Sequence, residues 1–233
     1  MKQKCYLSVS KTKLQWKGTN MKLLVLGATG ATGKLFVSQA LDAGHEVTAY
    51  VRDPAKVTQR QPNLAVVSGR VDDADALASA LAGQDAVVSM LGNGMGKTDK
   101  TLIEDSTHAL IRAAQDSGVE RVVIMSALGV AESFAKGSTV GKFVYKRFMA
   151  GVFADKARGE TELKSSRLDW TLAYPVALNN KPLSNKVTAT LLEDTPKLTG
   201  MPNITRADVA AWLLKTVTTG SFARQTVVLR AAK

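Results

Sequence analysis

The chain has 233 residues, of which 45% are hydrophobic and 22% are charged, which is the composition of an ordinary globular protein. No apolar run approaches the roughly 20 residues that cross a bilayer, so we expect no membrane-embedded segment. The net charge of +11 is the kind of excess seen in nucleic-acid-binding proteins. However, five lysines fall within residues 1–20, and the remainder carries 26 basic and 20 acidic residues. This moderate excess suits an anionic cofactor as well as a polymer, and we do not expect a nucleic-acid partner.

The first 20 residues are basic, contain no acidic residue and show little periodicity. They also lack the apolar stretch that a secretory signal requires. We therefore expect residues 1–20 to be a disordered basic extension and residues 21–233 to form one domain. The single cysteine, Cys5, excludes an intramolecular disulfide and is compatible with a reducing compartment, so we expect a cytoplasmic location.

The stretch from Met21 to Gly33 has the order strand, glycine turn, helix. An apolar run at 22–26 precedes GATGATG, and residues 34–41 resume with helical spacing. Glycines let the backbone turn tightly and approach a phosphate, and the following helix directs its positive N-terminal end at that phosphate. The G-x-x-G-x-x-G spacing is a relative of the dinucleotide fingerprint. Together with the later strands it predicts dinucleotide binding.

The second predicted strand, 46–51, ends at Arg52. An acidic residue at this place in the fold would accept the ribose 2′-hydroxyl of NAD, whereas an arginine accommodates a 2′-phosphate. We therefore predict a preference for NADP(H) over NAD(H). Two alternatives stay open: Arg52 is a solvated residue at a strand end, or the neighbouring Asp53 receives the hydroxyl.

Strands and helices are predicted to alternate along the rest of the chain, which implies a doubly wound parallel sheet with right-handed crossovers. A glycine-rich loop at 91–96 follows the fourth strand, where open sheets of this kind bind ligands, although its glycines are equally compatible with simple flexibility. Segments at about 130–160 and 176–205 are expected on the substrate side, the second as a small C-terminal lobe. The further predicted strands are 64–68, 85–90, 121–125, 170–174 and 225–229, and the further helices are 75–81, 101–117, 155–164 and 207–218.

The chain resembles the atypical short-chain dehydrogenase/reductases, and within them the NAD(P)H-binding flavin reductase and biliverdin reductase B-like group. The resemblance covers about 21–229 and implies a Rossmann-type fold and a small-molecule substrate. It lies in LVLGATGATGKLFVSQAL, HEVTAYVRDP, DAVVSMLG, GVERVVIMSALGV, LDWTLAYP and ITRADVAAWLL. These motifs indicate the family but not the substrate, because many activities share this fold and cofactor site.

Carried over position by position, the resemblance implies a set of cofactor contacts. It places the 2′-phosphate at Arg52 and the nicotinamide beside Ser126. The sequence departs from the family at Arg70, where relatives commonly carry an aspartate near the adenine. The pyrophosphate would be surrounded by Gly27, Thr29, Gly30, Ala31, Thr32 and Gly33, the ribose would lie near Leu91 and Gly92, and the nicotinamide end near Pro175 and Val176.

The conventional catalytic pattern of this family is incomplete. That pattern is a serine with Tyr-x-x-x-Lys, in which the lysine lowers the tyrosine pKa and the tyrosine transfers a proton. Lys156 stands at the lysine position, but Val152 stands four residues earlier, and Tyr145 is followed four residues later by Met149. Ser126 and Lys156 are left as catalytic candidates. Ser126 could equally be a strand-end serine that satisfies backbone groups only.

Together these features favour an NADPH-dependent oxidoreductase that reduces a conjugated or carbonyl-containing acceptor such as a flavin, quinone or tetrapyrrole. The alternatives are a non-catalytic NADP-binding redox sensor and, third, a sugar-nucleotide epimerase-like enzyme. The two scattered histidines, His45 and His108, make no metal site. We expect a monomer or homodimer.

Overall fold

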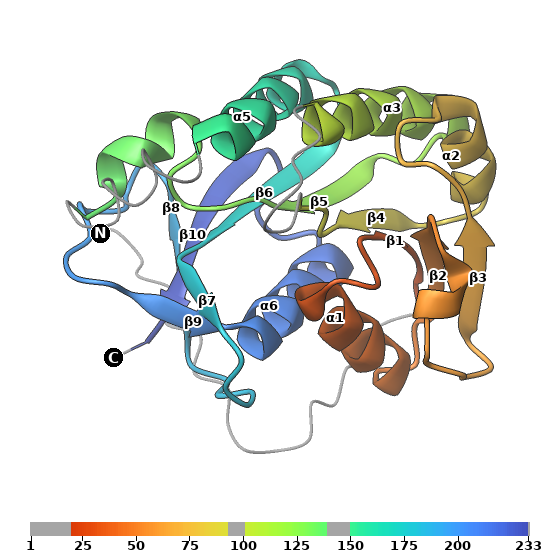
Figure 1. Ribbon diagram of the computed structural model, residues 1–233, viewed down its shortest axis with the longest axis horizontal. Helices are drawn as coiled ribbons and strands as arrows, with labels where there is room; N and C mark the ends of the chain where they lie inside the picture. The colour runs from red at the N-terminus through yellow and green to blue at the C-terminus, as the bar shows by residue number, and fades with distance from the viewer. Residues whose placement is uncertain (1–19, 93–100, 139–149, 233) are drawn as a thin grey trace.

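The computed structural model describes residues 20–92, 101–138 and 150–232. Within them, one mixed sheet has the strand order β3-β2-β1-β4-β5-β6-β10-β8 (Figure 1). Only the β10–β8 pairing is antiparallel, so the predicted doubly wound, Rossmann-type α/β fold is confirmed. The strands are β1 (Lys22–Leu26), β2 (Glu46–Val51), β3 (Leu64–Ser68), β4 (Ala86–Ser89), β5 (Arg121–Met125), β6 (Asp169–Pro175), β8 (Val187–Leu191) and β10 (Gln225–Ala231).

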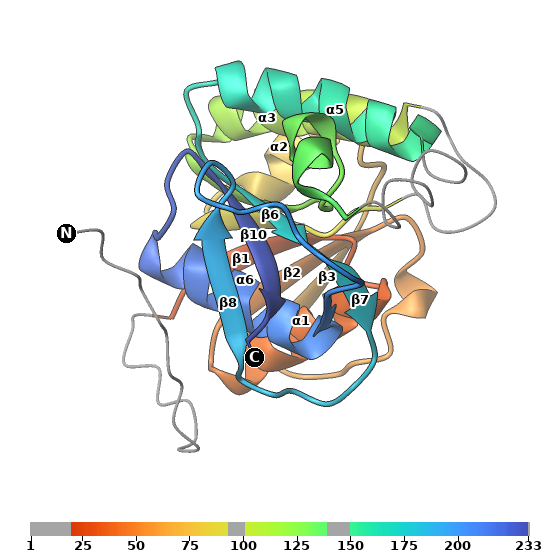
Figure 2. The ribbon, with the colours of Figure 1, turned by 90° about the vertical axis from the view of Figure 1, so that its left-hand side faces the viewer.

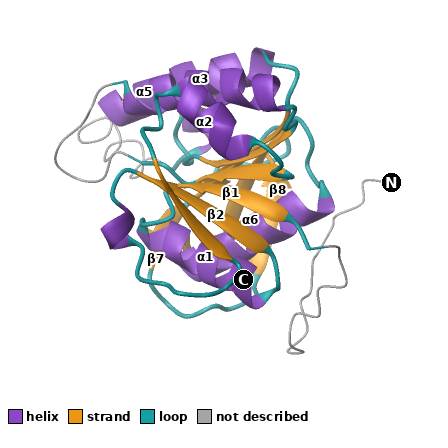
Figure 3. Cartoon of the chain, turned by 90° about the vertical axis from the view of Figure 1, so that its right-hand side faces the viewer, coloured by secondary structure: helices purple, strands orange, loops and turns teal. Residues whose placement is uncertain are grey.

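Helices cover both faces of the sheet, as Figures 1 and 3 show. One layer contains α1 (Ala31–Asp42) and α6 (Arg206–Thr219), which pack on each other. The opposite layer contains α2 (Ala74–Leu81), α3 (Leu102–Ser117) and α5 (Ala150–Ser165). Because the central strands are covered on both sides, they are continuous apolar runs such as LLVL and AVV, buried along their length.

The segment after β6 contains more regular structure than we predicted. It holds β8 and a small parallel pair of strands, β7 (Ala177–Asn179) and β9 (Asn203–Thr205). We predicted no strand between 170–174 and 225–229, and this was wrong, because β8 lies there at the edge of the main sheet beside β10 (Figure 2). The five residues of β8, VTATL, are half-buried and alternate apolar and polar side chains, so the period-two signal of a strand is present there and was overlooked.

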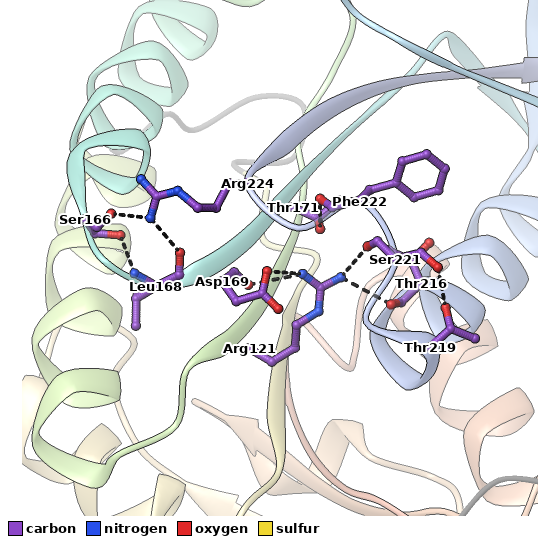
Figure 4. Close-up of polar contacts among 10 residues, drawn as sticks. All are labelled: Arg121, Ser166, Leu168, Asp169, Thr171, Thr216, Thr219, Ser221, Phe222 and Arg224. Atoms are coloured by element: carbon purple, nitrogen blue, oxygen red, sulfur yellow. Dashed lines mark hydrogen bonds and ion pairs between the residues drawn. The ribbon is translucent and has the colours of Figure 1, made fainter. Parts of the chain in front are cut away.

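A buried arginine ties the amino ends of two parallel strands to the end of a helix (Figure 4). Arg121 begins β5, and its guanidinium donates to the backbone and side-chain oxygens of Asp169, at 3.1 Å each. It also donates to the carbonyls of Thr216 and Ser221, at 3.2 and 2.8 Å. The carbonyls satisfy a charge that burial would otherwise penalise. This network lies at the edge of the sheet opposite to the glycine turn, so we assign it to stability.

We expect Arg121→Met to lower the free energy of unfolding by about 2–4 kcal/mol, because it leaves Asp169 and two carbonyls without their donor. Urea denaturation measures the loss. Arg224→Met is the matched control: the exposed Arg224 also donates to two carbonyls, those of Ser166 and Leu168, but water can replace it, so its loss should stay below about 1 kcal/mol. Equal losses in the two variants would contradict the assignment.

Candidate functional site

The glycine turn after β1 packs directly on the backbone that follows β4. Gly27 has a φ of +79°, and a Cβ there would lie 2.7 Å from the carbonyl carbon and oxygen of Met90. A Cβ on Gly33 would lie 2.1 Å from the carbonyl oxygen of Gly27. No side chain fits at either place without moving backbone. These two glycines therefore let the turn, the first turn of α1 and the end of β4 meet.

The N-terminus of α1 opens onto this turn without a side-chain cap. Its N-cap is Gly30, whose carbonyl accepts from Lys34 N at 2.9 Å. Because the first N–H groups of a helix have no partner inside it, they are available to an anion. Thr29 is half-buried and Gly30 and Ala31 are exposed, whereas Thr32 and Gly33 are buried. The structure thus brings all six predicted turn residues together, with Thr29, Gly30 and Ala31 facing outward.

The end of β2 presents basic groups beside the glycine turn. Arg52 is exposed and makes no hydrogen bond or ion pair with any described residue. Asp53 is engaged instead: its Oδ1 accepts from Ala55 N at 3.1 Å, and its Oδ2 lies 3.5 Å from Lys56 Nζ. Lys34 and Lys56 line a pocket next to Ala28 at the start of α1.

Further predicted residues lie at the carboxyl ends of neighbouring parallel strands. Leu91 and Gly92 directly follow the end of β4; the rest of that glycine-rich loop, 93–96, lies outside the described residues. Pro175 ends β6 and is buried, and its carbonyl accepts from Leu128 N at 3.1 Å. Val176 donates from its N–H to Leu229 O at 3.0 Å. The parallel topology therefore gathers these residues and the glycine turn along one edge of the sheet.

A buried polar cluster lies at the ends of β5 and β6, beneath α5. Ser126 Oγ donates to Glu160 Oε1, and Tyr174 Oη donates to Glu160 Oε2. Lys156 is one helical turn before Glu160, and the exposed fractions are 5% for Ser126, 5% for Glu160, 7% for Lys156 and 0% for Tyr174. We call these four residues the Glu160 cluster. It unites the two catalytic candidates, Ser126 and Lys156, with a carboxyl and a phenol that sequence reasoning had not assigned to the site.

Burial dominates the electrostatics of this cluster. Desolvation raises the pKa of Glu160, against the opposing effects of its two hydroxyl donors and of Lys156 and Lys164. Desolvation also lowers the pKa of Lys156, against the attraction of Glu160 and Asp155. The pKa of Tyr174 is raised by burial and by the adjacent carboxylate. Tyr174 therefore keeps its proton and serves as a hydrogen-bond donor.

Helix α5 is held in place from both sides of Lys156. Asp155 accepts from the backbone N–H groups of Ile103 and Glu104, at 3.1 and 2.9 Å, and so satisfies the N-terminus of α3. A Cβ on Gly159 would lie 2.9 Å from Thr107 Oγ1, so α5 and α3 are in close contact there. These contacts fix the face of α5 that carries Lys156 and Glu160.

Within the described residues of α5, no tyrosine stands at the position of the conventional pattern. Val152 occupies the position four residues before Lys156 and is half-buried. Tyr145 and Met149 lie outside the described residues. Tyr174 reaches the cluster from β6 instead, a placement that spacing along one helix could not reveal. The only sequence signals were a Glu one turn after Lys156 and a Tyr at the end of a parallel strand.

The described parts of the chain were also compared with the requirements of a metal site and of a membrane-spanning helix. They contain no group of three or more His, Cys, Asp or Glu side chains arranged to hold a metal ion. His45 is buried and its Nδ1 accepts from Met21 N at 3.2 Å, while His108 pairs with Glu162 on the surface. In 20–92, 101–138 and 150–232, no helix combines the length and the apolar character needed to cross a membrane.

Comparison with protein families gives one match, described as NAD(P)H-binding, over residues 27–219. The match begins at the first glycine of the turn and includes the Glu160 cluster. It confirms the resemblance to NAD(P)H-binding reductases that the sequence motifs indicated.

Curated relatives are between 27% and 33% identical to this chain over the segments that align. An uncharacterised chloroplast protein of Arabidopsis thaliana is 27% identical over 179 residues, which are 71% of this chain and 62% of that protein. A reductase of Streptomyces griseus, named for (4-alkanoyl-5-oxo-2,5-dihydrofuran-3-yl)methyl phosphate, is 31% identical over 162 residues, 70% of this chain and 50% of its own length. The chain thus spans less than two thirds of these relatives.

Among solved structures, an oxidoreductase from Lactococcus lactis superposes with a TM-score of 0.78. It is 20% identical, and the match covers 91% of this chain and 92% of that one. At this identity the likeness establishes the Rossmann-type fold only.

We expect Gly33→Ala to lower the free energy of unfolding by about 1–3 kcal/mol, the range for overpacking a well-packed site, because its methyl group would overlap the Gly27 carbonyl. Gly151→Ala on α5 is the matched control. A Cβ at Gly151 meets nothing within 4 Å, so this change should stabilise by about 0.5–1 kcal/mol through helix propensity. Thermal and urea denaturation measure both, and a neutral Gly33→Ala would contradict the close packing of the turn.

Proposed function

Because the chain belongs to the NAD(P)H-binding family, we propose that it is an NADPH-dependent reductase that transfers hydride to a small conjugated or carbonyl-containing acceptor. The observation that carries this proposal is the meeting of the uncapped α1 N-terminus and the buried Glu160 cluster at one edge of the sheet. The first feature suits a pyrophosphate, and the second suits proton handling beside the reacting carbon.

The residues present fit a dinucleotide. The space kept free of Cβ atoms at Gly27 and Gly33 lets backbone approach phosphates, with Thr29, Gly30, Ala31 and Thr32 supplying the remaining N–H groups and a hydroxyl. Leu91 and Gly92 would flank the ribose, and Ser126, Pro175 and Val176 the nicotinamide. When bound, the cofactor supplies the hydride. The protein binds both partners, orients them and handles the accompanying proton.

The basic residues at the end of β2 support NADP(H) over NAD(H). Arg52 is available to a 2′-phosphate, and Lys34 and Lys56 add positive charge nearby. Asp53, the residue that could accept a ribose hydroxyl, already accepts from Ala55 N at 3.1 Å. Arg52 therefore has no described partner, whereas Asp53 already holds a hydrogen bond and an ion pair.

The acceptor class has support from chemistry and from one relative. Without a tyrosine at position 152, proton transfer to a simple ketone by the conventional route is lost. A conjugated acceptor tolerates a weaker proton donor because its charge is delocalised. The Streptomyces griseus relative is named as a reductase of a ring that bears carbonyl groups.

The non-catalytic sensor remains the second candidate, and Val152 in place of the tyrosine is the observation that favours it. The epimerase-like alternative normally requires that same tyrosine. The predicted cytoplasmic location and the monomeric or homodimeric state stay predictions.

The proposal is tested by titrating the full chain with NADPH and NADH, followed by NADPH oxidation with FMN, a quinone and a linear tetrapyrrole. Binding with turnover is the expected result. Tight binding without turnover of any acceptor would favour the sensor, and failure to bind either nucleotide would overturn both candidates.

We expect Arg52→Asp to weaken NADPH binding by about 1–3 kcal/mol, the range for a charge-assisted hydrogen bond, and to weaken NADH binding less. Isothermal titration calorimetry measures both affinities. Arg112→Asp is the control with the same change of charge. Arg112 lies on α3 and pairs with Asp75 on the surface, so its replacement should leave both affinities unchanged. Equal losses for NADPH and NADH in Arg52→Asp would contradict the 2′-phosphate contact.

A further inference from the structure

We propose that Glu160 stores the proton that accompanies hydride transfer and delivers it to the acceptor through Ser126. This inference rests on the proposed reductase function and extends it to a residue outside the conventional catalytic pattern. Glu160 acts through Ser126, so it is a positioning residue in a proton path, and Ser126 is the group that would contact the acceptor.

The geometry gives each carboxyl oxygen of Glu160 its own hydroxyl. Ser126 lies at Oε1 and Tyr174 at Oε2. Tyr174 has no exposed surface and lies within β6, one residue before its end, whereas Ser126 directly follows β5 at the edge that carries the glycine turn. Of these two hydroxyls, Ser126 is therefore the one placed to meet a bound acceptor.

The backbone holds Ser126 in place independently of its hydroxyl. Its N–H donates to Ala173 O at 2.8 Å, which continues the β5–β6 ladder by one residue. The hydroxyl is consequently not needed to satisfy this N–H group. It is committed to Glu160 instead, which argues against the alternative that Ser126 only completes the strand end.

The proton balance requires one transfer along this chain. When Glu160 is protonated, its carboxyl O–H donates to Ser126 Oγ, the reverse of the bond that Ser126 donates to the carboxylate, and the serine O–H rotates toward the acceptor. As hydride adds to the acceptor carbon, the serine proton moves to the acceptor heteroatom and the carboxyl proton moves to Ser126 Oγ. The products are the oxidised nicotinamide, the reduced acceptor, an unchanged serine and a Glu160 carboxylate. Water restores the proton for the next turnover.

The charged groups around Glu160 suit both of its states. Lys156 and Lys164, one helical turn before and one after Glu160 on α5, favour the carboxylate that remains after transfer. The hydroxyl groups of Ser126, after β5, and Tyr174, in β6, favour it as well. Lys164 is also paired with Glu132 of the 3₁₀ segment Ala131–Lys136, at 2.7 Å. On α3, the Thr107 side chain and the Ile103 carbonyl oxygen lie against the neighbouring Gly159. Burial favours the neutral acid that precedes transfer.

The first test compares Glu160→Gln with wild type in NADPH oxidation, using an acceptor that the wild type reduces. The glutamine keeps the shape and accepts a hydrogen bond but has no acidic proton. We expect kcat to fall by about 10²-fold or more, the usual contribution of general acid catalysis, with little change in NADPH affinity. The wild-type kcat should decline as pH rises through the Glu160 pKa, and the variant should lack that decline.

Two further variants separate a proton path from a structural effect. Tyr174→Phe removes a hydrogen bond that favours the carboxylate, so the midpoint of the decline should move to higher pH. Glu162→Gln is the matched control on the same helix: its carboxylate is exposed and pairs with His108, so kcat and its pH profile should be those of the wild type. An unshifted midpoint in Tyr174→Phe would contradict the path.

A second readout needs no cofactor or acceptor. A carboxyl with a raised pKa binds its proton more tightly in the folded than in the unfolded protein. The wild type should therefore lose stability, relative to Glu160→Gln, as pH rises from the ordinary glutamate pKa through the raised one. If the free energies of unfolding of the two proteins change in parallel with pH, Glu160 does not hold the proton and the proposal is wrong.

The failures of the two proposals are distinguishable. If wild type reduces an acceptor but Glu160→Gln has unchanged kcat and pH profile, the proton path is wrong and the reductase stands. If wild type binds NADPH but reduces no acceptor, the reductase is wrong and the proton path falls with it.

Discussion

The site depends on the close approach of the glycine turn to the end of β4. Gly27 and Gly33 are the two positions at which any Cβ would collide with backbone, and both contacts are needed for β1, α1 and β4 to meet. Because α1 starts at this contact, its free N–H groups open at the carboxyl edge of the sheet. A larger residue at either place would move the helix away from the strand ends that carry the rest of the site.

Two buried polar networks lie at opposite edges of the same sheet and have different roles. Arg121 at the amino edge is surrounded mainly by carbonyls, which hold a permanent cation. Glu160 at the carboxyl edge is surrounded by hydroxyls, which accommodate either protonation state of a carboxyl. A cation held by backbone is a structural tie, whereas a carboxyl held by two rotatable O–H groups can exchange a proton with what binds beside it.

Local patterns account for the parts of the fold that sequence reasoning predicted correctly. The apolar runs of β1 and β4, the glycine spacing and the position of Arg52 after β2 each depend on a few neighbouring residues. The strand β8 was missed although its five half-buried residues, VTATL, alternate apolar and polar side chains. It is recruited as a strand by pairing with β10, a contact between segments about 40 residues apart.

The sequence by itself determined the Rossmann-type order, the glycine turn between β1 and α1 and the incomplete Tyr-x-x-x-Lys pattern, because each depends on residues that are close together along the chain. Only the tertiary structure decided which residues make up the Glu160 cluster. Ser126, Glu160 and Tyr174 come from a strand end, a helix and the next strand, and only the parallel register of β5 and β6 beneath α5 brings their oxygen atoms together. The spacing of residues along one element does not predict these contacts, because the contacts depend on how separate elements pack.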